Sequence, residues 1–341
     1  MTKFFKIIFF ILVIPGCSLN DTTGFWSNEK KILAQNKLKP IFKKEEKLIN
    51  EFNINFSFKF NPLTLKLNKK SYLDNNDGYV NYSGDLQKIS KYNFSKIDNY
   101  QQIEPDLIFF KNDIIFFDNK GTILSFDNKS KMVWKKNIYS KDEKKLKPLL
   151  LMNKINSKLI IADNLSKLYA LDITNGKILW SKNHNTPFNS QIKIFEESFF
   201  IVDANNNLIC YSIKNGEKIW SHKTEKPFIN SMKRLSIVVK DNLVIFNNSV
   251  GDITALNIKS GMLVWQISTQ NTENFTELID LKTSDLIINN DSVYFSNNKN
   301  KFYSIDLKTG SINWVQKINS FIKPSITGGL IFTINKEGYF L

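Results

Sequence analysis

The segment Leu168–Trp180 reads LYALDITNGKILW, and variants of it recur along the chain. It starts as a strand with a two-residue period and turns tightly between Asp172 and Gly176, where glycine supplies a positive φ. A second strand then carries the tryptophan, so the segment predicts a β-hairpin. The copies of the tryptophan are Trp134, Trp180, Trp220, Trp265 and Trp314, and the copies of the glycine are Gly176, Gly216, Gly261 and Gly310.

The spacing of these tryptophans indicates an internal repeat, because they are 46, 40, 45 and 49 residues apart. The copy that ends at Trp134 is one residue shorter and has no glycine. A second apolar hairpin precedes each copy, as at Leu159–Asp163, and a proline stands near the start of several units, where a first strand tolerates a missing donor. Two hairpins per unit predict a four-stranded sheet, and a series of such sheets is a β-propeller in which each tryptophan packs between neighbouring blades.

The phrase Ala-x-Asp-x-x-Thr/Asn-Gly-x-x-x-Trp resembles the tryptophan-docking repeat of the pyrroloquinoline-quinone-like β-propellers, over roughly residues 100–341. The resemblance implies an all-β propeller of four-stranded blades, with an eight-blade plan favoured. At least six blades can be read, namely five complete phrases and a sixth that begins at Gly328 and stops before its expected Asp and Trp. Either the chain is incomplete, or a strand from residues 78–95 closes the last blade and protects its edges.

The N-terminus has the pattern of an export signal. Residues 1–16 combine Lys3 and Lys6 with an apolar run that is too short to span a bilayer, which predicts a signal peptide. The run ends in a sequence that resembles the bacterial lipobox, with Cys17 as the lipid attachment site. An ordinary secretory signal followed by an accidental cysteine is the alternative. Ser18 follows where an aspartate would retain a lipoprotein in the inner membrane, which favours the outer membrane.

The expected domain organisation has three parts. After the signal peptide, residues 17–55 form a lipidated N-terminus and a tether, since they mix charged residues with few aliphatic ones. Residues 56–341 form the β-propeller. Expected features of the protein are therefore a lipid anchor, an outer-membrane location and a propeller on the periplasmic face.

The charge of the chain reflects its lysine content more than a nucleic-acid site. The 341 residues carry a formal net charge of +15, and their 47 basic residues are all lysine except Arg234. Recognition of bases and phosphates relies strongly on the planar guanidinium group of arginine, so a solvated lysine surface is favoured and no nucleic acid is expected as a partner. Two cysteines and two histidines are too few for a four-ligand zinc site.

Candidate reactive residues have structural interpretations that fit the repeat better than catalysis. Cys210 takes the small-residue position of Ala170, so it is predicted to be a packing residue. The repeated tryptophans are interpreted as inter-blade core and not as a stacking platform for sugars or bases. Three carboxylates fall at strand-to-turn junctions, where aspartate accepts backbone hydrogen bonds. These are Asp127, Asp172 and Asp306.

Two further features could suggest a metal site. His184 and His222 share no ligand spacing and are predicted to lie at the surface. The stretch Asp74–Gly78 lacks the ligand pattern of a calcium loop and is predicted to be a turn. No catalytic residue, metal site or cofactor is therefore expected.

The lipobox, the tether and the propeller together resemble the BamB-type lipoproteins of the outer-membrane β-barrel assembly machinery. The resemblance implies a non-catalytic scaffold that binds the barrel-assembly outer-membrane protein through its periplasmic domains, or unfolded outer-membrane proteins. One alternative is a quinone-dependent periplasmic dehydrogenase, although such enzymes add a vicinal cysteine pair that Cys17 and Cys210 do not form. The other alternative is a propeller that binds polysaccharide or a signalling partner.

Overall fold

A computed structural model describes residues 107–227, 234–269, 281–327 and 330–341. The chain divides into two units, residues 1–58 and 59–341, and all described residues belong to the second. The signal peptide, Cys17, the tether, the Asp74–Gly78 turn and the strand expected within residues 78–95 lie outside the described residues.

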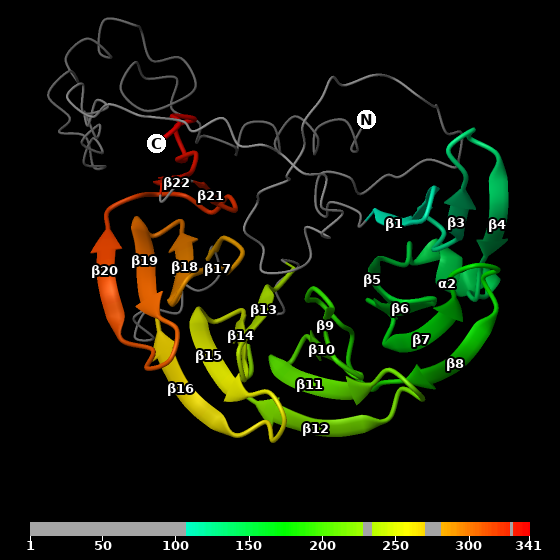
Figure 1. Cartoon of the computed structure of the whole chain (residues 1–341), viewed down its shortest axis with the longest axis horizontal. Coiled ribbons are helices and arrows are strands. Elements are labelled where there is room, and N and C mark those ends of the chain that lie inside the picture. The colour runs from blue at the N-terminus through cyan, green and yellow to red at the C-terminus, as the bar shows by residue number, and fades with distance from the viewer. Residues whose placement is uncertain (1–106, 228–233, 270–280, 328–329) are drawn as a thin grey trace, which may run out of the picture. The chain divides into compact units, whose positions relative to one another are not determined.

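The described residues form five four-stranded antiparallel sheets and one two-stranded sheet, each following the chain order (Figure 1). The first three sheets are β1 (Ile108–Phe110), β2 (Asp113–Phe117), β3 (Ile123–Phe126), β4 (Met132–Lys136); β5 (Leu150–Ile155), β6 (Lys158–Asp163), β7 (Lys167–Asp172), β8 (Ile178–Asn183); and β9 (Lys193–Phe195), β10 (Ser198–Val202), β11 (Asn207–Ser212), β12 (Lys218–Lys223). The others are β13 (Ile237–Lys240), β14 (Leu243–Asn247), β15 (Asp252–Asn257), β16 (Leu263–Ser268); β17 (Ile287–Asn289), β18 (Ser292–Asn297), β19 (Lys301–Asp306), β20 (Ile312–Gln316); and the pair β21 (Ser325–Thr327) and β22 (Leu330–Phe332). The prediction of an all-β protein built from four-stranded sheets is confirmed, and the number of blades is not established by these residues.

Consecutive sheets pack face to face, because each of four apolar cores draws its residues from two neighbouring sheets. The core between the first and second sheets, for example, joins Phe117 to Ile161, and the core between the fourth and fifth sheets joins Ile245 to Phe295. The middle strands are therefore covered on both faces, as in β6, where Leu159–Asp163 is entirely buried. The first strands of successive sheets also contact one another, from β1 to β17.

The connections between the sheets carry features that the sequence predicted only in part. Pro148, Pro187, Pro227 and Pro324 each precede the first strand of a sheet, in the expected place. The short helix α2 (Lys141–Lys145) between the first and second sheets was not predicted. Its N-terminal signal is a capping box, in which the Ser140 hydroxyl accepts from the Glu143 backbone N–H and the Glu143 carboxylate accepts from the Ser140 N–H.

No helix in the described ranges is long and apolar enough to serve as a membrane span.

Candidate binding surface on the outer strands

Four of the five repeat tryptophans join one sheet to the next. The Trp134 indole N–H donates to the carbonyl of Ile173 at 3.0 Å, and the Trp265 indole donates to Leu307 at 3.0 Å. The same bonds join Trp180 to Ile213 at 3.1 Å and Trp220 to Ile258 at 3.3 Å. In every case the acceptor lies three residues before the turn glycine of the following sheet. The repeated phrase is thus a docking device in which a sheet contributes both a tryptophan and the turn that receives its neighbour's tryptophan.

The turn glycines make close approach of the indole possible. Gly216 has a φ of +69°, and a Cβ placed there would lie 2.5 Å from the Trp180 ring. Gly176, Gly261 and Gly310 face the preceding tryptophan in the same way, with corresponding distances of 2.6–2.7 Å. The first sheet has Ser130 at a φ of +63° in its shorter turn, and residues 27–133 contain no tryptophan that could dock on it. Glycine therefore occurs where an indole needs the space.

A β-bulge precedes every docking tryptophan. The register between the third and fourth strands shifts by one residue in all five sheets, so that Ala170 faces Trp180 while Leu171 faces Ile178. The extra residue, Leu179 in this sheet, breaks the alternation of faces. Ile178 and Leu179 are therefore both exposed, while the indole of Trp180 packs toward the next sheet.

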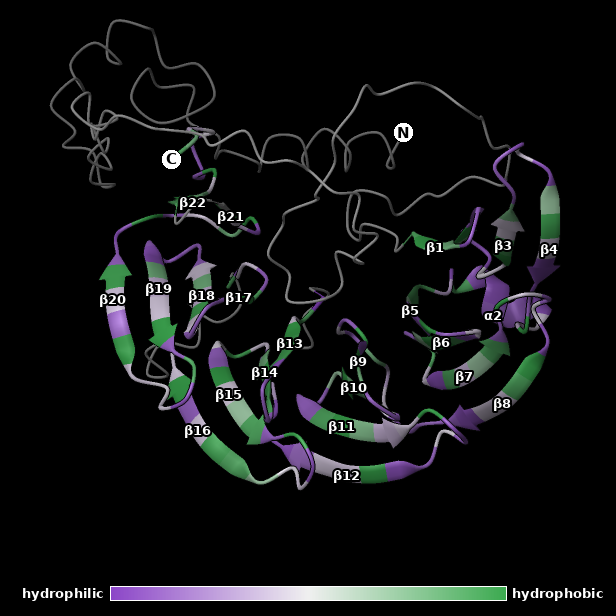
Figure 2. Cartoon of the chain, viewed as in Figure 1, coloured by the Kyte–Doolittle hydropathy of each residue, from purple (hydrophilic) through white to green (hydrophobic). Residues whose placement is uncertain are grey.

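The bulges create a repeated apolar surface, which we call the outer apolar belt. Its members are exposed side chains on or next to β4, β8, β12, β16 and β20. They are Met132, Val133, Ile178, Leu179, Ile219, Met262, Leu263, Val264, Ile312 and Val315. Figure 2 shows apolar segments on these fourth strands, interrupted by polar ones. Sequence reasoning placed the tryptophans but missed the belt, although the doubled apolar residues before Trp134, Trp180 and Trp265 were a signal for it.

The fourth strands are also edges, because each pairs with a neighbour on one side only. A strand with unpaired backbone N–H and C=O groups on one side can accept a further strand. Lysines such as Lys182 in β8 and Lys223 in β12 stand near the belt on these strands. Charged side chains on an edge discourage indiscriminate pairing, so the belt combines an available edge with protection against aggregation.

Cys210 lies in the core between the third and fourth sheets, where it faces Trp220 across the strand pair. It occupies the register position of Ala170 and Ala255, as the sequence predicted. Only 2% of the residue is exposed, and burial raises the pKa of its thiol to about 11.

This environment predicts an unreactive thiol. In the folded Cys17→Ser variant at pH 8, Cys210 should react with a thiol reagent at least about a hundredfold more slowly than in the same chain unfolded by urea. The reason is that a pKa two units above the ordinary value of 9.0 lowers the fraction of thiolate about a hundredfold. A chromogenic disulfide reagent measures the rate. Equal rates in the native and unfolded chain would contradict the placement of Cys210 in the core.

The three aspartates at strand-to-turn junctions hold their own turns. The Asp172 carboxylate accepts the Thr174 backbone N–H at 2.8 Å, and its bond to the Thr174 hydroxyl is the main cause that lowers the pKa of Asp172. Backbone and side-chain bonds from Thr309 lower the pKa of Asp306 in the same manner. Asp127 accepts from the backbone of Lys129 and Lys131. These carboxylates belong to the first, second and fifth sheets, so they do not meet at one catalytic centre.

A second row of polar residues was not predicted. It occupies the turn between the second and third strands of each sheet. In four of the five sheets, one side-chain oxygen of this residue accepts two backbone N–H groups, from the residues two and four positions later in the chain. The row consists of Asp118, Asp163, Asp203, Asn248 and Asn297, all buried. The Asp or Asn at the end of each second strand, or directly after it, was the available signal.

Two members of this row bind a side chain from the preceding sheet. The Tyr139 hydroxyl donates to the Asp163 carboxylate at 2.5 Å. Burial raises the pKa of Asp163, against the opposing effect of that bond, and burial also raises the pKa of Tyr139. His184 lies 3.3 Å from Asp203 and 3.3 Å from the Tyr211 hydroxyl. The pairs therefore link neighbouring sheets.

The prediction that both histidines lie at the surface needs correction. The His184 side chain is 24% exposed and stacks on Phe188, because the turn of the next sheet covers it. His222 is also half-buried, and burial lowers its pKa. Among the residues that the structure describes, no group of three or more His, Cys, Asp or Glu side chains could hold a metal ion.

The repeat also identifies the family of the chain. Residues 119–341 match the family model described as outer membrane protein assembly factor BamB. The chain belongs to this family. Its BamB-type propeller is further supported by the crystal structure of BamB from Moraxella catarrhalis, which is 16% identical and has a TM-score of 0.58, covering 69% of this chain and 70% of that one. At that identity the likeness shows the fold.

The curated proteins that match the chain are distant relatives. An uncharacterised protein of Rickettsia prowazekii is 24% identical over 281 residues, covering 80% of this chain and 66% of the relative. BamB of Moranella endobia is 21% identical over 250 residues, covering 70% of this chain and 63% of the relative. The chain thus spans about two thirds of the length of the curated relatives that it matches.

Proposed function

We propose that the protein is a non-catalytic scaffold of outer-membrane β-barrel assembly, lipid-anchored at Cys17 and facing the periplasm. The outer apolar belt on the fourth-strand edges carries the proposal, in a chain that belongs to the BamB family. Its partners would be unfolded outer-membrane proteins and the periplasmic domains of the barrel-assembly protein.

The belt suits an unfolded barrel strand for two reasons. An extended segment can pair its backbone with the free edge of a fourth strand, which supplies affinity without requiring a particular sequence. Strands of outer-membrane barrels alternate apolar and polar residues, so one face of such a segment is apolar along its length. Exposed pairs such as Ile178 and Leu179 would cover that face. The mechanism is binding and release, with no chemical step.

Capture of an unfolded outer-membrane protein tests the proposal. The double variant Leu179→Ser and Ile219→Ser removes belt residues that are 45% and 53% exposed, and it should reduce capture of a barrel protein diluted from urea at least fivefold. Leu146→Ser is the matched control, since Leu146 is 63% exposed but lies at the end of α2, outside the belt. Equal capture by both variants, or recovery of no assembly subunits with the native protein from membranes, would refute the scaffold role.

The anchor is tested separately. Cys17→Ala should move the protein from the membrane fraction to the soluble periplasmic fraction, because the cysteine sulfur is the expected site of lipid attachment. Immunoblots of the separated fractions measure the shift, with Cys210→Ala as the control that leaves the anchor intact. Unchanged fractionation of Cys17→Ala would show that Cys17 lipidation is not what holds the protein at the membrane.

A further inference from the structure

An open groove of about 550 Å³ lies beside the first sheet, outside the belt. Its lining residues come from the β2–β3 turn, from the end of β4 and the residue after it, and from α2. They are Lys120, Thr122, Lys135, Lys136, Asn137 and Lys144. Four of these six side chains are therefore ammonium groups, and no carboxylate lines the groove.

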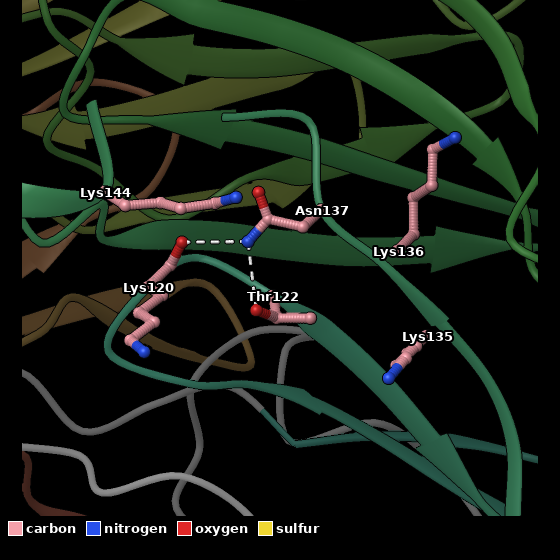
Figure 3. Close-up of a pocket in the computed structure, with 6 residues that line it drawn as sticks. All are labelled: Lys120, Thr122, Lys135, Lys136, Asn137 and Lys144. Carbon is pink, nitrogen blue, oxygen red and sulfur yellow. Dashed lines mark hydrogen bonds between the residues drawn. The ribbon is translucent and has the colours of Figure 1, made fainter. Parts of the chain in front are cut away.

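The groove is held in shape by Asn137. Its side-chain amide donates to the Lys120 carbonyl at 3.0 Å and to the Thr122 hydroxyl at 2.9 Å, as Figure 3 shows. Its side-chain oxygen accepts the Tyr139 backbone N–H at 2.9 Å. These bonds tie the chain that leaves β4 to the turn that starts β3. In Figure 3, Lys144 extends toward Asn137, which places an ammonium group from α2 beside the two strands.

The acids nearest in sequence to Lys144 are committed to other lysines. Asp142 pairs with Lys145 at 2.8 Å, and Glu143 pairs with Lys167 at 2.7 Å while also accepting the Ser140 N–H. Neither Lys145 nor Lys167 lines the groove. No ion pair within the described residues involves any of the four groove lysines. The positive charge of the groove is therefore not neutralised by the described part of the fold.

The charge of the groove suits an anionic ligand. Lys120 and Lys135 are exposed and Lys136 and Lys144 are half-buried, so the groove offers four ammonium groups at an accessible surface. Four positive charges without a carboxylate among them attract an anion to the groove. Lysine ammonium groups act as point charges toward phosphate, and the open shape of the groove suits a broad anionic surface better than an enclosed small ion.

We propose that this lysine groove binds the phosphate headgroups of anionic phospholipids and so provides a second contact between the protein and a membrane. The inference goes beyond the scaffold role, and it rests on the proposed anchor only for the location of the protein. A lipid anchor combined with a basic patch holds a protein more firmly than either alone, and each lysine near an anionic surface adds about fivefold to partitioning. The patch would also orient the first sheet toward the bilayer.

Vesicle sedimentation tests the groove with the processed chain from residue 17 carrying Cys17→Ser, so that no lipid anchor contributes. Native protein should partition onto phosphatidylglycerol vesicles and much less onto phosphatidylcholine vesicles. The variant with Lys120, Lys135, Lys136 and Lys144 all changed to Gln should lose at least thirtyfold of that partitioning. The control changes Lys177, Lys214, Lys218 and Lys259 to Gln, which are exposed lysines with the same total charge. It should lose threefold or less, and circular dichroism should show both variants folded.

Several outcomes would overturn the proposal. Equal losses in the two variants would mean that binding follows net charge and not the groove. Partitioning of the native protein that millimolar inorganic phosphate abolishes at constant ionic strength would assign the groove to a free anion. Retained vesicle binding by the groove variant, together with loss of assembly subunits from its pull-down, would assign the groove to an acidic protein segment. The vesicle readouts do not depend on capture by the belt or on recovery of assembly subunits, so a failure of vesicle binding leaves the scaffold role standing.

Discussion

Gly216→Ala is expected to lower the free energy of unfolding by about 2–5 kcal/mol. A non-glycine residue at the left-handed φ of +69° costs about 1–2 kcal/mol, and overpacking in a filled core costs about 1–3 kcal/mol. The added methyl group would lie 2.5 Å from the Trp180 ring, so the indole must move away from the Ile213 carbonyl that it binds. Urea unfolding with an unchanged slope measures the loss.

Gly338→Ala is the matched control for this change. Gly338 also has a positive φ, of +89°, but a Cβ there would meet no atom within 4 Å. It should lose only the backbone contribution, about 1–2 kcal/mol. In a Trp180→Ala background, Gly216→Ala should lower the free energy of unfolding by less than it does in the native protein, because the indole that the new methyl group would meet is gone. Equal losses at the two glycines would mean that close approach of the indole is not what requires glycine.

Trp265→Ala is expected to cost about 3–5 kcal/mol, the range for removing a large buried aromatic side chain. Trp265 is 7% exposed and its indole N–H donates to the Leu307 carbonyl, which would then lose its partner. The missing ring would leave a cavity between the fourth and fifth sheets. Thermal unfolding followed by circular dichroism, supported by urea titration, measures the change.

The same substitution at Trp314 is a control within the repeat. Trp314 is 36% exposed, and no turn glycine lies against it among the described residues. Its ring packs on Phe302 and Tyr294 of its own sheet, with centroid separations of 5.8 and 6.0 Å. Trp314→Ala should therefore cost about 1–2 kcal/mol, mostly from these aromatic pairs. A loss as large as that of Trp265→Ala would show that Trp314 is docked as deeply as the other tryptophans.

Much of the fold could be predicted from the sequence because the same hairpin pattern, with its tryptophan, recurs several times along the chain. A tryptophan, a turn glycine and an alternating strand each have a narrow structural meaning, and their recurrence at about 45 residues leaves few architectures. The number of blades could not be predicted, since closure of a propeller depends on how its two ends meet. The helix α2 was missed because five residues leave little periodicity to detect, although its capping box was present.

The candidate surfaces were harder to predict than the fold. The outer apolar belt depends on a bulge at Leu179 and its equivalents, and a shift of one residue reverses which side chains face outward. The half-buried state of His184 depends on the turn at Asp203, 19 residues further along the chain. The lysine groove depends on which carboxylates pair with which lysines, as with Glu143 and Lys167.

Local sequence was therefore sufficient for the strands and the turns, because steric limits on φ act over a few residues. Recurrence of the tryptophan predicted that it packs between neighbouring sheets, and the structure added that Trp180 lies on the Gly216 turn. Which side chains are exposed, and which charges are paired, could be learned only from the folded structure. The bulges help to direct belt residues such as Leu179 away from the core, and the acids of α2 pair with Lys145 and Lys167 and not with Lys144. Those properties arise from relations between distant residues, which the spacing of a repeat does not encode.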